Sequence, residues 1–176
     1  MREAVSAIAV VQPGLLAMAA VLLGLASLND IATRTIPDLV PLALMVIGVA
    51  THLVHGTATT AIAAGAAVLL VCGLCWRCGW IGGGDVKLLA ACACLVPSAL
   101  VLQLVLLTAI VGGVLATVYL ILSRLTWVSR VPIYSAPARS LVGRIGRAEL
   151  WRIRRRAGLP YACAIAIATL LTLSIR

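Results

Sequence analysis

The sequence predicts an all-α, polytopic membrane protein with six transmembrane helices and both termini on the extracytoplasmic side. Apolar residues make up 63% of the 176 residues and charged residues only 11%, and the mean hydropathy is +1.16. A soluble globule of this size would need far more polar surface. Polar breaks divide the apolar sequence into runs, and the basic residues gather in every second break, which predicts the orientation.

Six apolar runs supply the helices of a single membrane-embedded domain over residues 1–176. They cover residues up to 28, then about 39–53, 57–75, 85–96, 99–122 and 159–175. The first span begins or kinks near Pro13, and the apolar run continues too far past Ala17-Met18-Ala19 for a cleaved signal peptide. The fourth run would form only about 18 Å of helix, against a hydrocarbon core of about 30 Å. Its polar start is therefore expected in a cavity shielded by protein.

Basic residues divide very unevenly between the two sides that six spans define. One side receives only Arg2 and Arg176. The other receives twelve residues: Arg34, Arg77, Lys87, Arg124, Arg130, Arg139, Arg144, Arg147, Arg152, Arg154, Arg155 and Arg156. Because basic residues accumulate on the cytoplasmic side, this second side is predicted to face the cytoplasm.

A basic cytoplasmic loop is expected at about residues 123–158, where arginines alternate with apolar residues such as Trp151. This pattern is typical of a helix that lies on anionic lipid, although a docking surface for an anionic partner would have a similar composition. Nucleic acid is an unlikely partner for a segment tethered to the bilayer at both ends. The net charge of +9 therefore indicates membrane orientation.

Two acidic residues, Asp30 and Asp85, stand at the ends of apolar runs at the same predicted membrane face. Gly82-Gly83-Gly84 leads directly into Asp85 at the start of the fourth span, and Asp30 ends the first. Asp85 could simply cap the helix that follows, but an acidic residue at the mouth of a membrane segment is a functional candidate by default. The glycines allow a tight turn and the close approach of another chain, such as an extended peptide.

Two carboxylates brought together by helix packing cannot both ionise at low cost, so they would share a proton. That is the arrangement of an aspartic protease, in which one carboxylate activates water and the other protonates the scissile carbonyl. No cofactor is needed for this chemistry. The sequence contains no G-x-S-x-G elbow that would indicate a serine nucleophile.

Potential metal ligands do not form a convincing site. His52 and His55 are expected in a short loop on the opposite side, far from other ligand types. Cys72, Cys75 and Cys78 recur every third residue, but a lone C-x-x-C without a second pair is weak evidence for zinc or redox chemistry. We therefore predict no metal.

Three segments resemble the motifs of type IV prepilin peptidases. Residues 30–38, DIATRTIPD, resemble the first aspartate motif, in which Ile-Pro-Asn or Ile-Pro-Asp follows a basic stretch. Residues 82–90, GGGDVKLLA, resemble the G-x-G-D motif with its Lys-Leu extension, and residues 159–166, LPYACAIA, are similar to the opening of the last helix in the short Tad/Cpa-type members. The order and spacing of the three segments also fit that family.

The resemblance implies a membrane aspartic endopeptidase that removes the basic leader from prepilins or pseudopilins at the cytoplasmic face. Asp30 and Asp85 would be the catalytic pair. Ala32 and Thr35 stand where a basic residue is common, which leaves contacts with the leader in question, and Ala162 stands where glycine is usual. Because Asp30 comes so early, we expect no amino-terminal cysteine-bearing domain and no methyl transfer.

The same resemblance suggests residues that contact the substrate beside the catalytic pair: Gly82, Gly83, Gly84, Lys87 and Arg34. Each has a simpler interpretation, as a tight turn for the glycines and as membrane-edge anchors for the two basic residues.

Asp38 is an alternative first carboxylate, although its position before Leu39 is better explained as the cap of the second span. Two other functions remain open. A small transporter could use the carboxylates to couple protons or cations, but it would need further polar groups across the spans, which offer little beyond Gln103. A pure scaffold would leave the paired carboxylates unexplained.

Overall fold

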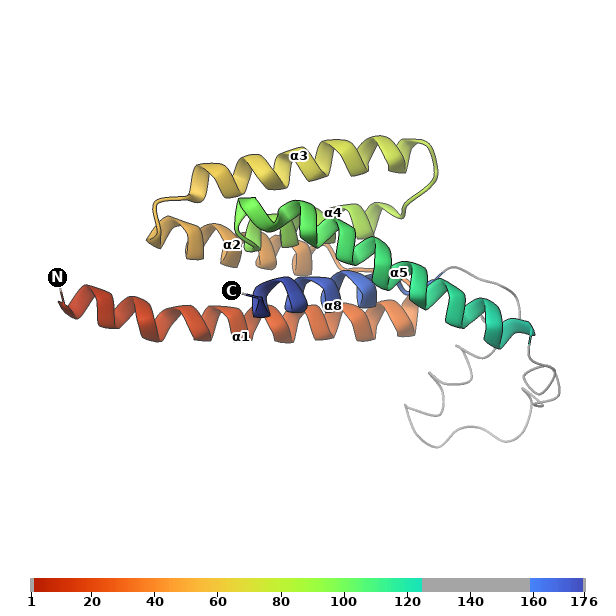
Figure 1. Cartoon of the computed structure of the whole chain (residues 1–176), viewed down its shortest axis with the longest axis horizontal. Helices are drawn as coiled ribbons and strands as arrows, with labels where there is room; N and C mark the ends of the chain where they lie inside the picture. Colours follow the sequence, from red (N-terminus) through yellow and green to blue (C-terminus); the bar gives the residue numbers. More distant parts are fainter. Residues whose placement is uncertain (1, 125–158, 176) are drawn as a thin grey trace, which may run out of the picture.

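The structure, a computed structural model, describes residues 2–124 and 159–175, with side chains from Pro13 onward. This part of the chain is helical throughout (Figure 1). The elements are α1 (Arg2–Thr33), α2 (Leu39–Val54), α3 (Ala58–Arg77), α4 (Gly83–Leu95), the short 3₁₀ helix η1 (Ser98–Leu100), α5 (Val101–Arg124) and α8 (Tyr161–Ser174). The predicted all-α class is therefore confirmed for the described residues.

The six α-helices alternate in direction along one common axis (Figure 1). Both chain ends lie toward one end of the bundle. The C-terminal ends of α1, α3 and α5 lie toward the other, together with the N-terminal ends of α2, α4 and α8. Asp30 and Asp85 therefore share one end of the molecule, although they are far apart in the sequence.

The two shortest α-helices, α4 and α8, form the interior of the bundle. Helix α4 packs against α2, α3 and α8, and α8 also packs against α1 and α5. Every residue from Val86 to Val96 is buried except Lys87. The first turn of this 13-residue helix is less enclosed, since Gly83, Gly84 and Asp85 are only partly buried.

Close packing around α4 depends on glycine in its neighbours. A Cβ atom at Gly48 of α2 would lie 2.7 Å from the Cys94 carbonyl oxygen, and one at Gly65 of α3 would meet the Cys94 side chain and lie 3.1 Å from the Ala90 oxygen. Small residues let membrane helices approach one another in this way. Gly112 of α5 similarly faces Tyr161, at 3.1 Å, whereas its neighbour Gly113 faces open space.

The outer surface of the helices is apolar, as expected for contact with lipid. Leu28, Leu70 and Leu102 are among many large side chains that are more than half exposed. Three segments are long and apolar enough to cross a membrane, namely Pro13–Thr33, Ala58–Arg77 and Ser98–Arg124. Helices α2 and α8 are apolar but shorter. These features indicate a membrane protein, while the count of six spans and the sides of the termini stay predictions.

Several predicted boundaries need correction. Helix α1 runs through Pro13 and does not begin there. His52, expected in a loop, is buried in the last turn of α2, where its Nδ1 lies 2.8 Å from the Thr57 hydroxyl. Helix α5 continues to Arg124, past the predicted end of the fifth span. The rest of the predicted basic loop, residues 125–158, lies outside the described residues.

Candidate active site

Asp30 lies near the end of α1 and is only 6% exposed. Its Oδ2 accepts a hydrogen bond of 3.1 Å from the backbone N–H of Ala162, in the first turn of α8. The first amides of a helix have no partner within the helix and carry its positive end, so a carboxylate is stabilised there. Asp30 thus joins α1 to α8.

The backbone after Asp30 turns sharply at Arg34. This residue has a φ of 58°, in the left-handed region, and its N–H donates to the Asp30 carbonyl oxygen at 2.9 Å. A left-handed residue commonly ends a helix, although glycine usually fills this position. The Asn29 amide donates to the Thr35 carbonyl oxygen at 2.8 Å and supports the same turn. The turn brings residues 34–38 back across the end of the bundle.

Asp85 is the third residue of α4 and is partly buried. The alternative that Asp85 itself caps this helix does not hold, because the cap position is Gly82 and no side chain bonds to the free amides there. The helix begins two residues before Asp85, at Gly83. Asp85 consequently projects from the first turn rather than folding back onto its own helix end.

The three glycines have different neighbours. A Cβ at Gly82 would lie 2.9 Å from Asp85 Oδ2, one at Gly83 would lie 3.2 Å from the Trp76 ring nitrogen, and one at Gly84 would lie 3.4 Å from Ile36 Cβ. The Asp85 carboxylate therefore occupies the space that a side chain at residue 82 would need. Gly84 brings α4 into contact with the turn after α1.

Asp85 is coupled electrostatically to both groups at the end of α1. Its carboxylate is repelled by Asp30 and attracted by the Arg34 guanidinium. Two carboxylates that repel each other in a partly buried site favour the state in which they hold one proton between them. The fold thus brings together Asp30, Asp85 and Arg34, three of the residues predicted from the two aspartate segments.

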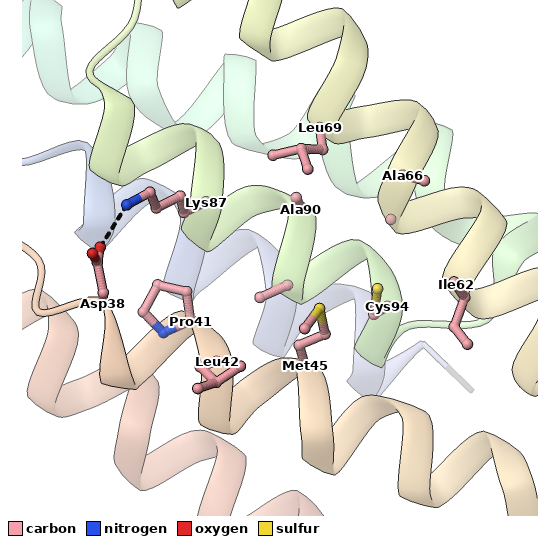
Figure 2. A pocket seen from close by; sticks show the side chains of 12 residues that line it. Asp38, Pro41, Leu42, Met45, Ile62, Ala66, Leu69, Lys87, Ala90 and Cys94 are labelled. Atoms are coloured by element: carbon pink, nitrogen blue, oxygen red, sulfur yellow. Dashed lines mark hydrogen bonds and ion pairs between the residues drawn. The ribbon is translucent and has the colours of Figure 1, made fainter.

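Lys87 and Asp38 lie on the other side of α4. Lys87 is two residues from Asp85, about 200° around the helix, and its Nζ bonds to Asp38 Oδ1 at 2.7 Å. Asp38 stands at the cap position of α2 but makes no capping hydrogen bond with its side chain. Asp38 therefore occupies the predicted cap position, but its carboxylate pairs with Lys87 and not with the free amides of α2 (Figure 2).

An apolar groove of about 470 Å³ extends along this second face of α4 (Figure 2). The ion pair lies at one end of the groove, and α2 and α3 form its walls. Its floor is formed by Ala90, Ala91 and Cys94. Since these residues share the helix face of Lys87, the groove opens away from Asp85 and is separate from the paired carboxylates.

Potential metal ligands stay apart in the described part of the chain. No three His, Cys, Asp or Glu side chains converge within residues 2–124 and 159–175. Cys72 is buried while Cys78 is exposed, so the regularly spaced cysteines do not share one environment. No disulfide links the six cysteines.

The model of the type IV leader peptidase family matches residues 17–117, more than half of the chain. The chain belongs to the type IV leader peptidase family. The matched region runs from α1 into α5 and includes both Asp30 and Asp85. Comparisons with curated proteins and with solved structures find no significant match.

Membership in the type IV leader peptidase family confirms the family predicted from the three motifs. It identifies the protein as a hydrolase of the leader peptidase kind in general. Sequence reasoning missed the bond from Ala162 to Asp30 and the left-handed turn at Arg34. The third motif singled out the start of α8, but it did not indicate that a backbone N–H there contacts Asp30. Nearly every residue has a backbone N–H, so the sequence gives no signal for this contact.

Proposed function

We propose that the protein is a membrane-embedded aspartic endopeptidase that removes basic leader peptides from type IV, Flp-like prepilins. The observation that carries this proposal is the placement of Asp30, near the end of α1, and Asp85, in the first turn of α4, at the same end of the bundle. A peptide reaching this end could be cleaved without crossing the bilayer. The basic residues at the same end, including Arg34 and Arg77, support its placement at the cytoplasmic face of a bacterial inner membrane.

The different surroundings of the two acids support different roles. The Ala162 N–H and the positive end of α8 favour the charged form of Asp30. Asp30 would therefore accept a proton from the attacking water, while Asp85 would hold the shared proton and donate it to the scissile carbonyl. When the tetrahedral gem-diol collapses, Asp30 gives its proton to the leaving amine and Asp85 takes a proton back from a gem-diol hydroxyl, which restores the starting state of both acids. One water is consumed and the peptide bond is broken.

The glycine segment supports a peptide substrate. Gly82 is exposed and in an extended conformation, with φ −69° and ψ 142°. An exposed extended backbone without side chains lets another extended chain approach closely. Gly82 and Gly83 would then contact the substrate, while Arg34 acts on the Asp85 carboxylate. Lys87, a predicted substrate contact, lies on the far side of α4 from Asp85, where it pairs with Asp38.

Transport coupled to the same carboxylates is not favoured by the interior of the bundle. The hydroxyls of Thr108, Thr169 and Thr172 each donate to a carbonyl oxygen of their own helix one turn earlier. Buried hydroxyls that are satisfied in this way do not form a chain of groups across the membrane. The paired acids are therefore better explained as a hydrolytic centre than as one step of a proton path.

The proposal is tested by incubating membranes that contain the protein with a candidate prepilin and following the shortened product. Asp30→Asn and Asp85→Asn should each abolish cleavage, because an amide can neither take nor give the shared proton. Asn at residue 30 still offers an oxygen to the Ala162 N–H, so the protein should accumulate normally. Asp38→Asn should still cleave. Unchanged cleavage by either catalytic variant would rule the mechanism out.

A further inference from the structure

We propose that the ion pair between Asp38 and Lys87 positions Asp85 for catalysis from the opposite face of α4. This inference rests on the proposed peptidase function. It assigns to both residues a role that differs from substrate contact, helix capping or direct chemistry. The ion pair joins the two sequence segments that carry the catalytic acids, and it does so two residues after Asp85 on the helix that presents this acid (Figure 2).

The turn between α1 and α2 contacts α4 at two points. Ile36 packs against the backbone at Gly84, where an added Cβ would meet it at 3.4 Å. Asp38 bonds to Lys87 Nζ at 2.7 Å. Residue 84 lies in the first turn of α4 and residue 87 begins the second, on either side of Asp85 in the sequence. The turn therefore holds this part of α4 in both position and rotation.

The same turn begins with Arg34, which acts electrostatically on Asp85. The bond from Asp38, at the other end of this turn, to Lys87 consequently fixes two features of the geometry. It sets the rotation of α4, which determines where the Asp85 carboxylate points, and it sets the place of the guanidinium relative to that carboxylate. Loss of the ion pair should therefore alter the positions of the Asp85 carboxylate and the Arg34 guanidinium, without any direct contact between Lys87 and the substrate.

The ion pair is too exposed to serve mainly as a source of stability. The Lys87 and Asp38 side chains are 53% and 77% exposed. Exposed pairs typically contribute about 0–1 kcal/mol to folding. Catalysis is more sensitive to geometry, because a displacement of about 1 Å in a catalytic group can reduce the rate by about 10²-fold. Loss of the pair should therefore affect turnover far more than it affects accumulation of the protein.

The test compares steady-state kinetics of the full-length protein in nanodiscs, with a fluorogenic prepilin peptide as substrate. Asp38→Asn and Lys87→Met should each lower kcat by about tenfold, with KM nearly unchanged and thermal stability preserved. The two reversals, Asp38→Lys and Lys87→Asp, should be more harmful alone. Combined in one chain they restore the pair with opposite polarity and should recover kcat to within about threefold of wild type.

The possible results separate this inference from the proposed function. If wild type does not cleave, or if Asp85→Asn cleaves equally well, the peptidase proposal fails and this inference fails with it. If cleavage depends on Asp85 but the single variants keep the wild-type kcat, only the positioning role is overturned. A rise in KM at constant kcat for Lys87→Met would likewise overturn it, since that result indicates direct substrate contact. Failure of the reversed pair to rescue activity would also contradict it.

Discussion

Gly82 is the residue that most directly limits where the Asp85 carboxylate can lie. Its backbone, at φ −69° and ψ 142°, is accessible to any amino acid, so glycine is not required there for conformational reasons. What distinguishes the position is space, because an added Cβ would lie 2.9 Å from Asp85 Oδ2. The position of the Asp85 carboxylate thus requires that residue 82 has no side chain.

Gly82→Ala should therefore reduce activity without unfolding the protein. The methyl group must push the Asp85 carboxylate aside, and a shift of about 1 Å can reduce kcat by about 10²-fold. Gly73→Ala in α3 is the control, since nothing lies within 4 Å of its Cβ position. Cleavage rates and thermal stability of the two variants provide the measurement. Equal activity of Gly82→Ala and wild type would show that the carboxylate position is not limiting.

Asp30 combines a structural and a chemical role, and two substitutions separate them. Asp30→Asn keeps an oxygen for the Ala162 N–H, whereas Asp30→Ala leaves that buried donor without its 3.1 Å bond. Loss of a comparable helix-capping bond costs about 0.5–2 kcal/mol. We expect both variants to be inactive, but only Asp30→Ala to unfold at lower temperature. Equal melting temperatures would contradict the structural role of the bond.

At the scale of elements, α4 is held by backbone contacts that only glycine permits. A Cβ at Gly48 would lie 2.7 Å from the Cys94 carbonyl oxygen and 2.9 Å from Leu95 Cα. Neither backbone atom can move without displacing α4 itself. Helix α2 therefore fixes the depth of α4 at its C-terminal end, while the turn between α1 and α2 fixes its first turn.

Gly48→Ala should destabilise the protein by about 1–3 kcal/mol, the usual cost of overpacking a core. Gly24→Ala in α1 is a suitable control because nothing lies within 4 Å of its Cβ position. In an open helical position, alanine is favoured over glycine by about 1 kcal/mol. Thermal unfolding in detergent should thus shift down for Gly48→Ala and slightly up, or not at all, for Gly24→Ala. A neutral Gly48→Ala would show that the two helices can separate freely.

The helices could be predicted from the sequence because apolar runs and polar breaks are local signals. Residues 39–53 were expected in the second span, and α2 covers Leu39–Val54. The helix ends were less predictable, because Asp85 and Asp38 are both good capping residues in isolation. Contacts between distant parts of the chain compete with capping, because Asp38 pairs with Lys87, 49 residues away. No local sequence pattern predicts such a contact.

The convergence of Asp30 and Asp85 was predictable for a different reason. Both stood at helix ends on the same side of a six-span topology, so alternation of direction alone placed them at one end of the bundle. Their mutual orientation was not predictable, because it depends on the left-handed turn at Arg34 and on the contact between Ile36 and Gly84. Arginine is an unusual residue at a positive φ, and glycine would have been the expected signal.

At the scale of the whole molecule, alternation of the helices separates the chain into two chemically different ends. The end that holds Asp30 and Asp85 also holds Arg34, Arg77 and Lys87, whereas the chain termini lie toward the opposite end (Figure 1). If the bundle spans a bilayer, both termini must share a side, and the carboxylates must lie at the other. The positive-inside rule then predicts that the carboxylates face the cytoplasm. Which side of the membrane holds the termini and which side holds the paired carboxylates is therefore a single question.

Native Cys78 can answer that question, because it is exposed and follows α3 at the end of the bundle that carries Asp85. A membrane-impermeant thiol reagent should label it in inverted vesicles but not in intact cells. Cys78→Ala should remove that labelling. In the Cys78→Ala background, His55→Cys places an exposed thiol after α2, at the opposite end, and should show the reverse pattern. Labelling of both thiols from one side would mean that the helices between them do not cross the membrane. Labelling of Cys78 from outside intact cells would place the paired acids away from the cytoplasm.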